Sequence, residues 1–206
     1  GVLSGAEWFE ATLCEGMWCG NVYMTMVRRD LLLLHHIRFM EGVIAEDLLW
    51  NAMVQSKAKR VAYTPKRGYY YRHTPGSIMN DHSPEAKLRL IYSSMIVSEE
   101  LWRMADAETP RIALLFKRLA TAQGRILLAH IAGFGPLRQR IAILSELRKR
   151  GFLGRLFRET KTIGHRKRIV SAYGHSWLGA FIAGTASADL KKTGTRLLAY
   201  KSSVKQ

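Results

Sequence analysis

Two adjacent carboxylates, Glu46 and Asp47, are the residues of this 206-residue chain whose type and position best suit chemistry. The apolar pattern that follows them predicts a helix, so they would lie in its first turn. There the free backbone N–H groups and the helix dipole stabilise an ionised carboxylate, each by about 0.3–1 kcal/mol when exposed. Such a carboxylate could accept a proton from an attacking hydroxyl. Ordinary capping of the helix is the alternative interpretation.

Arg72 is the second candidate, because it follows three tyrosines at positions 69–71. An arginine beside aromatic faces could hold a phosphate through two parallel N–H bonds. We therefore place Arg72 and Tyr70 in the substrate-binding set. The alternative is a half-buried strand, since residues 60–63 and 69–72 are β-type runs separated by Pro65 and Gly68 and predict a hairpin or neighbouring strands.

The cysteines and histidines of the sequence show no metal-binding spacing. Cys14 and Cys19 are the two cysteines, and neither a second cysteine pair nor a regular histidine spacing completes a tetrahedral site. We expect reduced thiols and a cytoplasmic protein without a metal site of its own. The chain opens on Gly1 with no leader pattern, which indicates a fragment or a processed chain.

The remaining patterns change from mixed α/β to all-α near Ser83. The first part predicts a short helix over 5–15 capped by Ser4, a buried strand over 22–27 and a helix over 28–34. Ser83 followed by Pro84 is a strong helix start. The expected elements after it are helices over 84–107, from 110 to about 127, and over 137–150.

Charge is distributed unevenly along the chain. Residues 1–110 hold 12 Lys/Arg and 13 Asp/Glu, whereas residues 111–206 hold 20 Lys/Arg and three Asp/Glu, giving net charges of −1 and +17. A half this basic attracts polyanions, by about 1 kcal/mol for each cation near an anionic membrane. Residues 169–188, within this basic half, contain no charged side chain. They predict a segment that lies at the membrane interface, with a packed helix or a membrane span as alternatives.

Four ordered landmarks resemble a known family. Arg-Arg-Asp-Leu at 28–31, Ile-Arg-Phe-Met-Glu-Gly at 37–42, Glu-Asp at 46–47, and Tyr-Tyr-Tyr-Arg at 69–72 leading to Gly-Ser-Ile-Met at 76–79 occur in compatible spacing. Together they resemble the C-terminal half of a bacterial family-2 glycosyltransferase. The resemblance covers about residues 5–80 and extends more loosely to about 158.

This resemblance implies inverting sugar transfer on a GT-A type α/β fold, followed here by an all-α basic tail. Asp47 would be the general base for the acceptor hydroxyl, with Glu46 orienting the acceptor. The implied partners are a nucleotide-sugar donor and a glycan or lipid-linked acceptor in surface polysaccharide or lipid-linked glycan synthesis, at the cytoplasmic face of an anionic membrane. The implied organisation is an acceptor-side part over 1–82, a helical lobe over 83–158 and a basic tail over 159–206.

The sequence departs from the family pattern at the metal. The family's Asp-x-Asp motif, which holds manganese or magnesium against the diphosphate, is absent from the 206 residues. We expect most of the metal ligands, and the nucleotide-binding half, to lie outside this chain. A non-catalytic basic protein that binds nucleic acid or an anionic membrane surface is the alternative function; no helix-turn-helix or zinc-finger signature accompanies it, so nucleic acid is not an expected partner.

Overall fold

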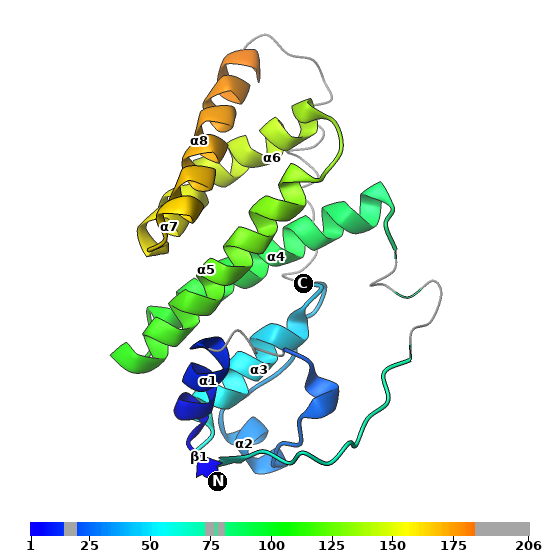
Figure 1. Ribbon diagram of the computed structural model, residues 1–206, viewed down its shortest axis with the longest axis vertical. Helices are drawn as coiled ribbons and strands as arrows, with labels where there is room; N and C mark the ends of the chain where they lie inside the picture. The colour runs from blue at the N-terminus through cyan, green and yellow to red at the C-terminus, as the bar shows by residue number, and fades with distance from the viewer. Residues whose placement is uncertain (15–19, 73–76, 78–80, 184–206) are drawn as a thin grey trace.

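The computed structural model describes residues 1–14, 20–72, 77 and 81–183, with the side chains of 176–183 left out. Figure 1 shows a helical protein in which a long pair of helices connects a small N-terminal part to a second group of helices. The elements are β1 (Val2–Leu3), α1 (Gly5–Cys14), the 3-10 helix η1 (Val22–Met24), α2 (Arg29–Leu34), α3 (Glu46–Lys57), β2 (Val61–Ala62), α4 (Pro84–Ala105), α5 (Pro110–Ala132), α6 (Leu137–Lys149), α7 (Phe152–Glu159) and α8 (Ile163–Ala183).

The N-terminal part is built on α1 and α3. Ser4 caps α1 as predicted: its hydroxyl accepts from the Glu7 N–H at 3.3 Å, and its own N–H donates to the Glu7 carboxylate at 2.7 Å. Val2 pairs with Ala62 in an antiparallel two-stranded sheet that joins β1 to β2. Gly5 donates to the Ala58 carbonyl at 2.8 Å, so α1 begins directly against the end of α3.

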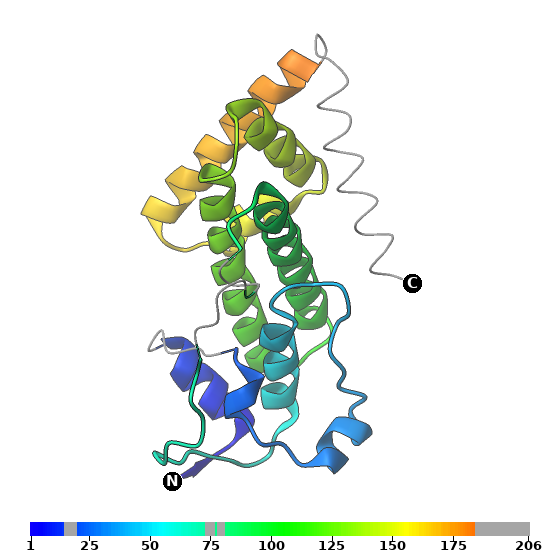
Figure 2. The ribbon, with the colours of Figure 1, turned by 90° about the vertical axis from the view of Figure 1, so that its right-hand side faces the viewer.

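Helices α4 and α5 form an antiparallel pair that lies side by side in both views (Figures 1 and 2). Ser83 caps α4 by accepting from the Ala86 N–H at 3.1 Å, and Pro84 and Pro110 stand at the starts of the two helices. The helices predicted at 5–15, 28–34, 46 onward, 84–107, 110 onward and 137–150 are all confirmed, within a few residues at their ends.

Two strand predictions are wrong. Residues 22–24 form a 3-10 helix, and residues 25–27 have no regular structure. Met24 and Met26 are 69% and 99% exposed, so this apolar run is not buried between two layers as a core strand would be. The first of the two β-type runs does contain a strand, β2, but it pairs with β1, and residues 69–72 have no regular structure, so the predicted pairing of the two runs is wrong.

The larger of two apolar clusters among the described residues runs from the N-terminal part to α8. Phe9 of α1 meets Phe116 of α5 edge-on at 5.9 Å, Leu49 of α3 joins them, and Trp102 of α4 packs against Phe152 of α7 at 5.0 Å. The core therefore crosses both residue 83 and residue 159. The GT-A fold class and the three-part division of the chain stay predictions.

Helix α8 takes up most of the uncharged segment. Ile169 is fully buried and Ala172 nearly so, and both belong to the common core. Within the ranges described above, no helix combines the length and apolar character needed to cross a membrane. Residues 184–188 of the predicted interfacial segment lie outside the described residues.

Candidate functional site

A loop fixed to α4 sets the position of the two carboxylates. The Ile44 N–H donates to the hydroxyl of Ser93, a fully buried residue of α4, at 2.8 Å. Ala45 follows in the left-handed conformation (φ 68°, ψ 31°) and serves as the N-cap residue of α3. A non-glycine residue rarely adopts this conformation, and its surroundings must hold it there. The chain therefore enters α3 at a fixed angle.

Asp47 is a half-buried carboxylate in the first turn of α3. Its Oδ1 accepts from the Leu48 N–H at 2.8 Å. Burial raises the pKa of Asp47 above its ordinary value and the charge of Glu46 adds to this, while the N–H groups of Leu48 and of Asp47 itself act in the opposite direction. Asp47 thus contributes to the helix start and also holds a proton more readily than an exposed capping acid.

The face of α3 that carries Asp47 continues to Asn51, four residues and about one turn later. Asn51 is almost fully buried and donates from Nδ2 to the Gly20 carbonyl. A Cβ on Gly20 would lie 3.1 Å from the Cα of Leu48, so the segment passes close against α3. Asn51 was missed by the sequence analysis. A polar residue among the apolar residues of a predicted helix was the signal that could have identified it, because a buried polar side chain needs a hydrogen-bond partner.

Arg72 and Tyr70 lie elsewhere, on an exposed stretch of chain. Tyr70 is 90% exposed, and Arg72 is also exposed. Tyr69 stacks on Tyr23 of η1 with ring centroids 4.4 Å apart, which ties this stretch to the segment that packs against α3. Within the described ranges, no hydrogen bond or ion pair joins Arg72 or Tyr70 to the two carboxylates.

The described residues do not fit a divalent metal. They contain no cluster of three or more histidine, cysteine or carboxylate side chains close enough to share an ion. Cys14 is exposed and not in a disulfide, and Cys19 lies outside the described residues. The metal expected from the family resemblance would need ligands that this part of the chain does not supply.

A known protein matches part of this chain. Over 74 residues, the chain is 34% identical to a protein of Escherichia coli (strain K12) named uncharacterized glycosyltransferase YibD. The match covers 35% of this chain and 22% of that protein, so the chain spans less than a quarter of its relative's length. No family model and no solved structure matches the chain. The chain is thus related, over about a third of its length, to a glycosyltransferase.

Proposed function

We propose that this chain is the acceptor-side part of an inverting glycosyltransferase of the family-2 type, in which Asp47 is the general base. The carrying observation is the half-buried Asp47 carboxylate, fixed at the start of α3 and shifted toward a higher pKa. The partial similarity to a protein named as a glycosyltransferase supports the reaction class.

In this proposal, Asp47 takes the proton of the acceptor hydroxyl as its oxygen attacks the anomeric carbon of the donor sugar. The bond from that carbon to the nucleoside diphosphate breaks, and the diphosphate leaves with the electron pair. An aspartate is a weak base for an alcohol, so most of its contribution is positioning, which the fixed loop before α3 favours. A raised pKa of Asp47 brings it closer to the pKa of the acceptor hydroxyl, which makes the carboxylate a stronger base.

Other residues complete the proposal. Glu46, on the same turn, would orient the acceptor, and Asn51 would hold the Gly20 segment against the base. Arg72 and Tyr70 lie on an exposed stretch, where they would contact a glycan or a diphosphate. The nucleotide-sugar site and its manganese or magnesium would come from residues outside this chain. The basic residues after 110 would attract the protein to an anionic membrane surface, where a lipid-linked acceptor would lie.

The test uses a protein that contains this chain together with a nucleotide-sugar domain. Release of nucleoside diphosphate in the presence of acceptor is measured for Asp47→Asn and for the matched control Glu85→Gln, an exposed acid in the first turn of α4. We expect at least about a hundredfold loss of transfer for the first variant and little change for the second. Near-normal transfer by Asp47→Asn would remove the base assignment.

The pH dependence gives a second readout of the same assignment. A base acts in its ionised form, so transfer should rise with pH through the pKa of Asp47. Because burial raises that pKa, the acidic limb should lie above the range of an ordinary aspartate. A limb at the ordinary value, or none, would place the proton transfer elsewhere.

A further inference from the structure

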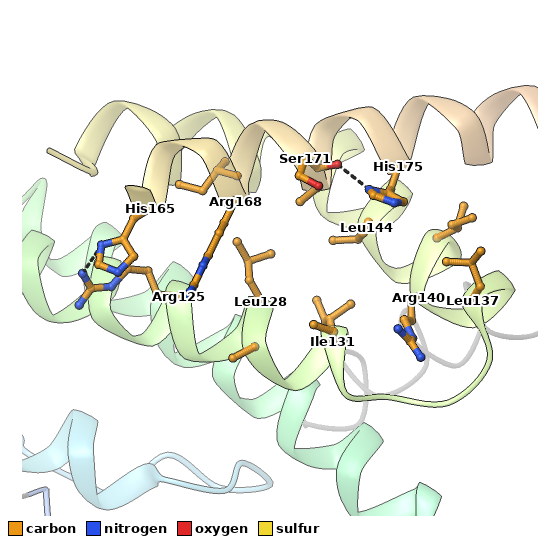
Figure 3. Close-up of a pocket in the computed structure, with 15 residues that line it drawn as sticks. Arg125, Leu128, Ile131, Leu137, Arg140, Leu144, His165, Arg168, Ser171 and His175 are labelled. Atoms are coloured by element: carbon orange, nitrogen blue, oxygen red, sulfur yellow. Dashed lines mark hydrogen bonds between the residues drawn. The ribbon is translucent and has the colours of Figure 1, made fainter. Parts of the chain in front are cut away.

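A cavity of about 580 Å³ lies between α5, α6 and α8, apart from Asp47 (Figure 3). This volume falls within the usual range for small-molecule sites. Most of the lining side chains are aliphatic, and Leu128, Ile131 and Leu144 form the middle of the cavity in the close-up. The ionisable lining residues are all basic, and no Asp or Glu is among them.

The basic groups gather most closely at one end. Figure 3 shows His165 beside Arg125, with the side chain of Arg168 running down from α8 toward the same place. Arg125 Nη1 lies 3.0 Å from His165 Nδ1. A guanidinium can only donate, so Nδ1 of His165 accepts and its proton is on Nε2. Burial and the charges of Arg125 and Arg168 lower the pKa of His165.

This end has positive charge without a carboxylate to balance it. Among the described residues, neither Arg125 nor Arg168 forms an ion pair with an acid. Two exposed arginines and a half-buried histidine that line the same end of the cavity suit an anion with several oxygens, such as a phosphate. Behind them the aliphatic wall cannot satisfy a polar ligand, so the ligand must also have an apolar part.

We propose that this cavity binds a single-chain anionic lipid, with the phosphate on Arg125, Arg168 and His165 and the alkyl chain along the aliphatic wall. From His165 to His175, α8 rises about 15 Å, which gives the chain an extended path. The proposal does not depend on the reaction assigned to Asp47. Residues 184–206 hold five Lys/Arg and one acid, so their charge has the same sign as the rim and does not complement it.

Calorimetric titration of the full chain with dodecyl phosphate, below its micelle concentration, tests the proposal. Each buried methylene should strengthen binding about fourfold, so inorganic phosphate should bind at least about a hundredfold more weakly. Dodecyl trimethylammonium has the same chain with the opposite charge and should also bind far more weakly. If inorganic phosphate binds as tightly as dodecyl phosphate, the cavity is only an anion site. If the ammonium compound binds as tightly, the cavity only takes up apolar chains. Either result overturns the proposal.

Matched variants locate the site. Arg168→Gln should weaken dodecyl phosphate binding about tenfold, whereas Lys167→Gln, an exposed neighbour outside the cavity, should not change it. Ala129→Trp fills the cavity from an exposed position of α5 and should abolish binding, while Ile126→Trp on the same helix should not. Unchanged thermal unfolding shows that the variants fold. Equal effects within either pair of variants overturn the assignment. Binding to anionic phospholipid vesicles without binding of monomeric dodecyl phosphate also overturns it.

Discussion

The bond from Ile44 to Ser93 predicts a measurable link between α4 and the loop that positions Asp47. Ser93→Ala removes the hydroxyl that accepts the Ile44 N–H at 2.8 Å and leaves this donor without its partner. An unsatisfied buried donor costs about 1–3 kcal/mol. Because Ile44 is half-buried and water can reach part of it, we expect the lower half of this range, about 1–2 kcal/mol of unfolding free energy.

Ser98→Ala is the matched control, on the same helix and at the same full burial. The Ser98 hydroxyl donates to the Ser94 carbonyl at 2.8 Å, within α4. That carbonyl also lies in the helical ladder, so the variant leaves no backbone group without a partner. We expect a loss below about 0.5 kcal/mol.

Urea unfolding followed by circular dichroism gives both free energies, and thermal unfolding checks them. At about 2–4 °C for each kcal/mol in a chain of this size, Ser93→Ala should lower the Tm by about 2–8 °C. If Ser93→Ala and Ser98→Ala lose the same stability, the loop is not held by this bond and the reasoning about the position of Asp47 fails.

Three further predictions concern stability and charge. Asp47→Asn should raise the free energy of unfolding at pH 7 by roughly a few tenths of a kcal/mol, because burial raises the pKa of Asp47 in the folded state and makes its ionised form unfavourable. This gain should shrink as the pH falls through that pKa. A gain that grows in acid would contradict the direction of the pKa shift. Gly5→Ala should cost about 1–3 kcal/mol in urea unfolding, because its Cβ would collide with the Gln55 carbonyl and lie 2.8 Å from that of Ala58, whereas Gly68→Ala meets nothing within 4 Å and should be nearly neutral. The basic residues after 110 should bind anionic vesicles in sedimentation assays, at least about tenfold more weakly at 200 mM than at 50 mM salt. Insensitivity to salt would contradict an electrostatic contact, and stronger binding to duplex DNA would favour the nucleic-acid alternative.

The helices could be predicted because their signals are local. Ser4, Ser83 with Pro84, and Pro110 each mark a start within a few residues of sequence. The strand prediction at 22–27 failed because a short apolar run has no period that separates a buried strand from an exposed connection. The exposed methionines of this run show that hydrophobicity alone did not decide its burial.

The candidate site was predicted only in part. Glu46 and Asp47 stand at a helix start as the sequence indicated, whereas the left-handed Ala45 has no sequence signal. The partners that hold this region come from far along the chain: Ser93 is 49 residues from Ile44, and Asn51 is 31 residues from Gly20. Such pairings depend on how helices pack in three dimensions, which residue spacing does not encode.

Helix α5 sets a fixed separation between the two ends of the molecule. Phe116 meets Phe9 of the N-terminal part, and Leu128 lines the cavity twelve residues later, an interval of about 18 Å along a rigid helix. Arg125 lies nine residues, or about 14 Å along the helix, from the contact between Phe116 and Phe9, so a lipid phosphate seated there is set apart from the N-terminal part. Because its single alkyl chain would lie inside the protein and not in a bilayer, the lipid in this cavity would be a separate bound ligand, and the acceptor hydroxyl would belong to a different molecule.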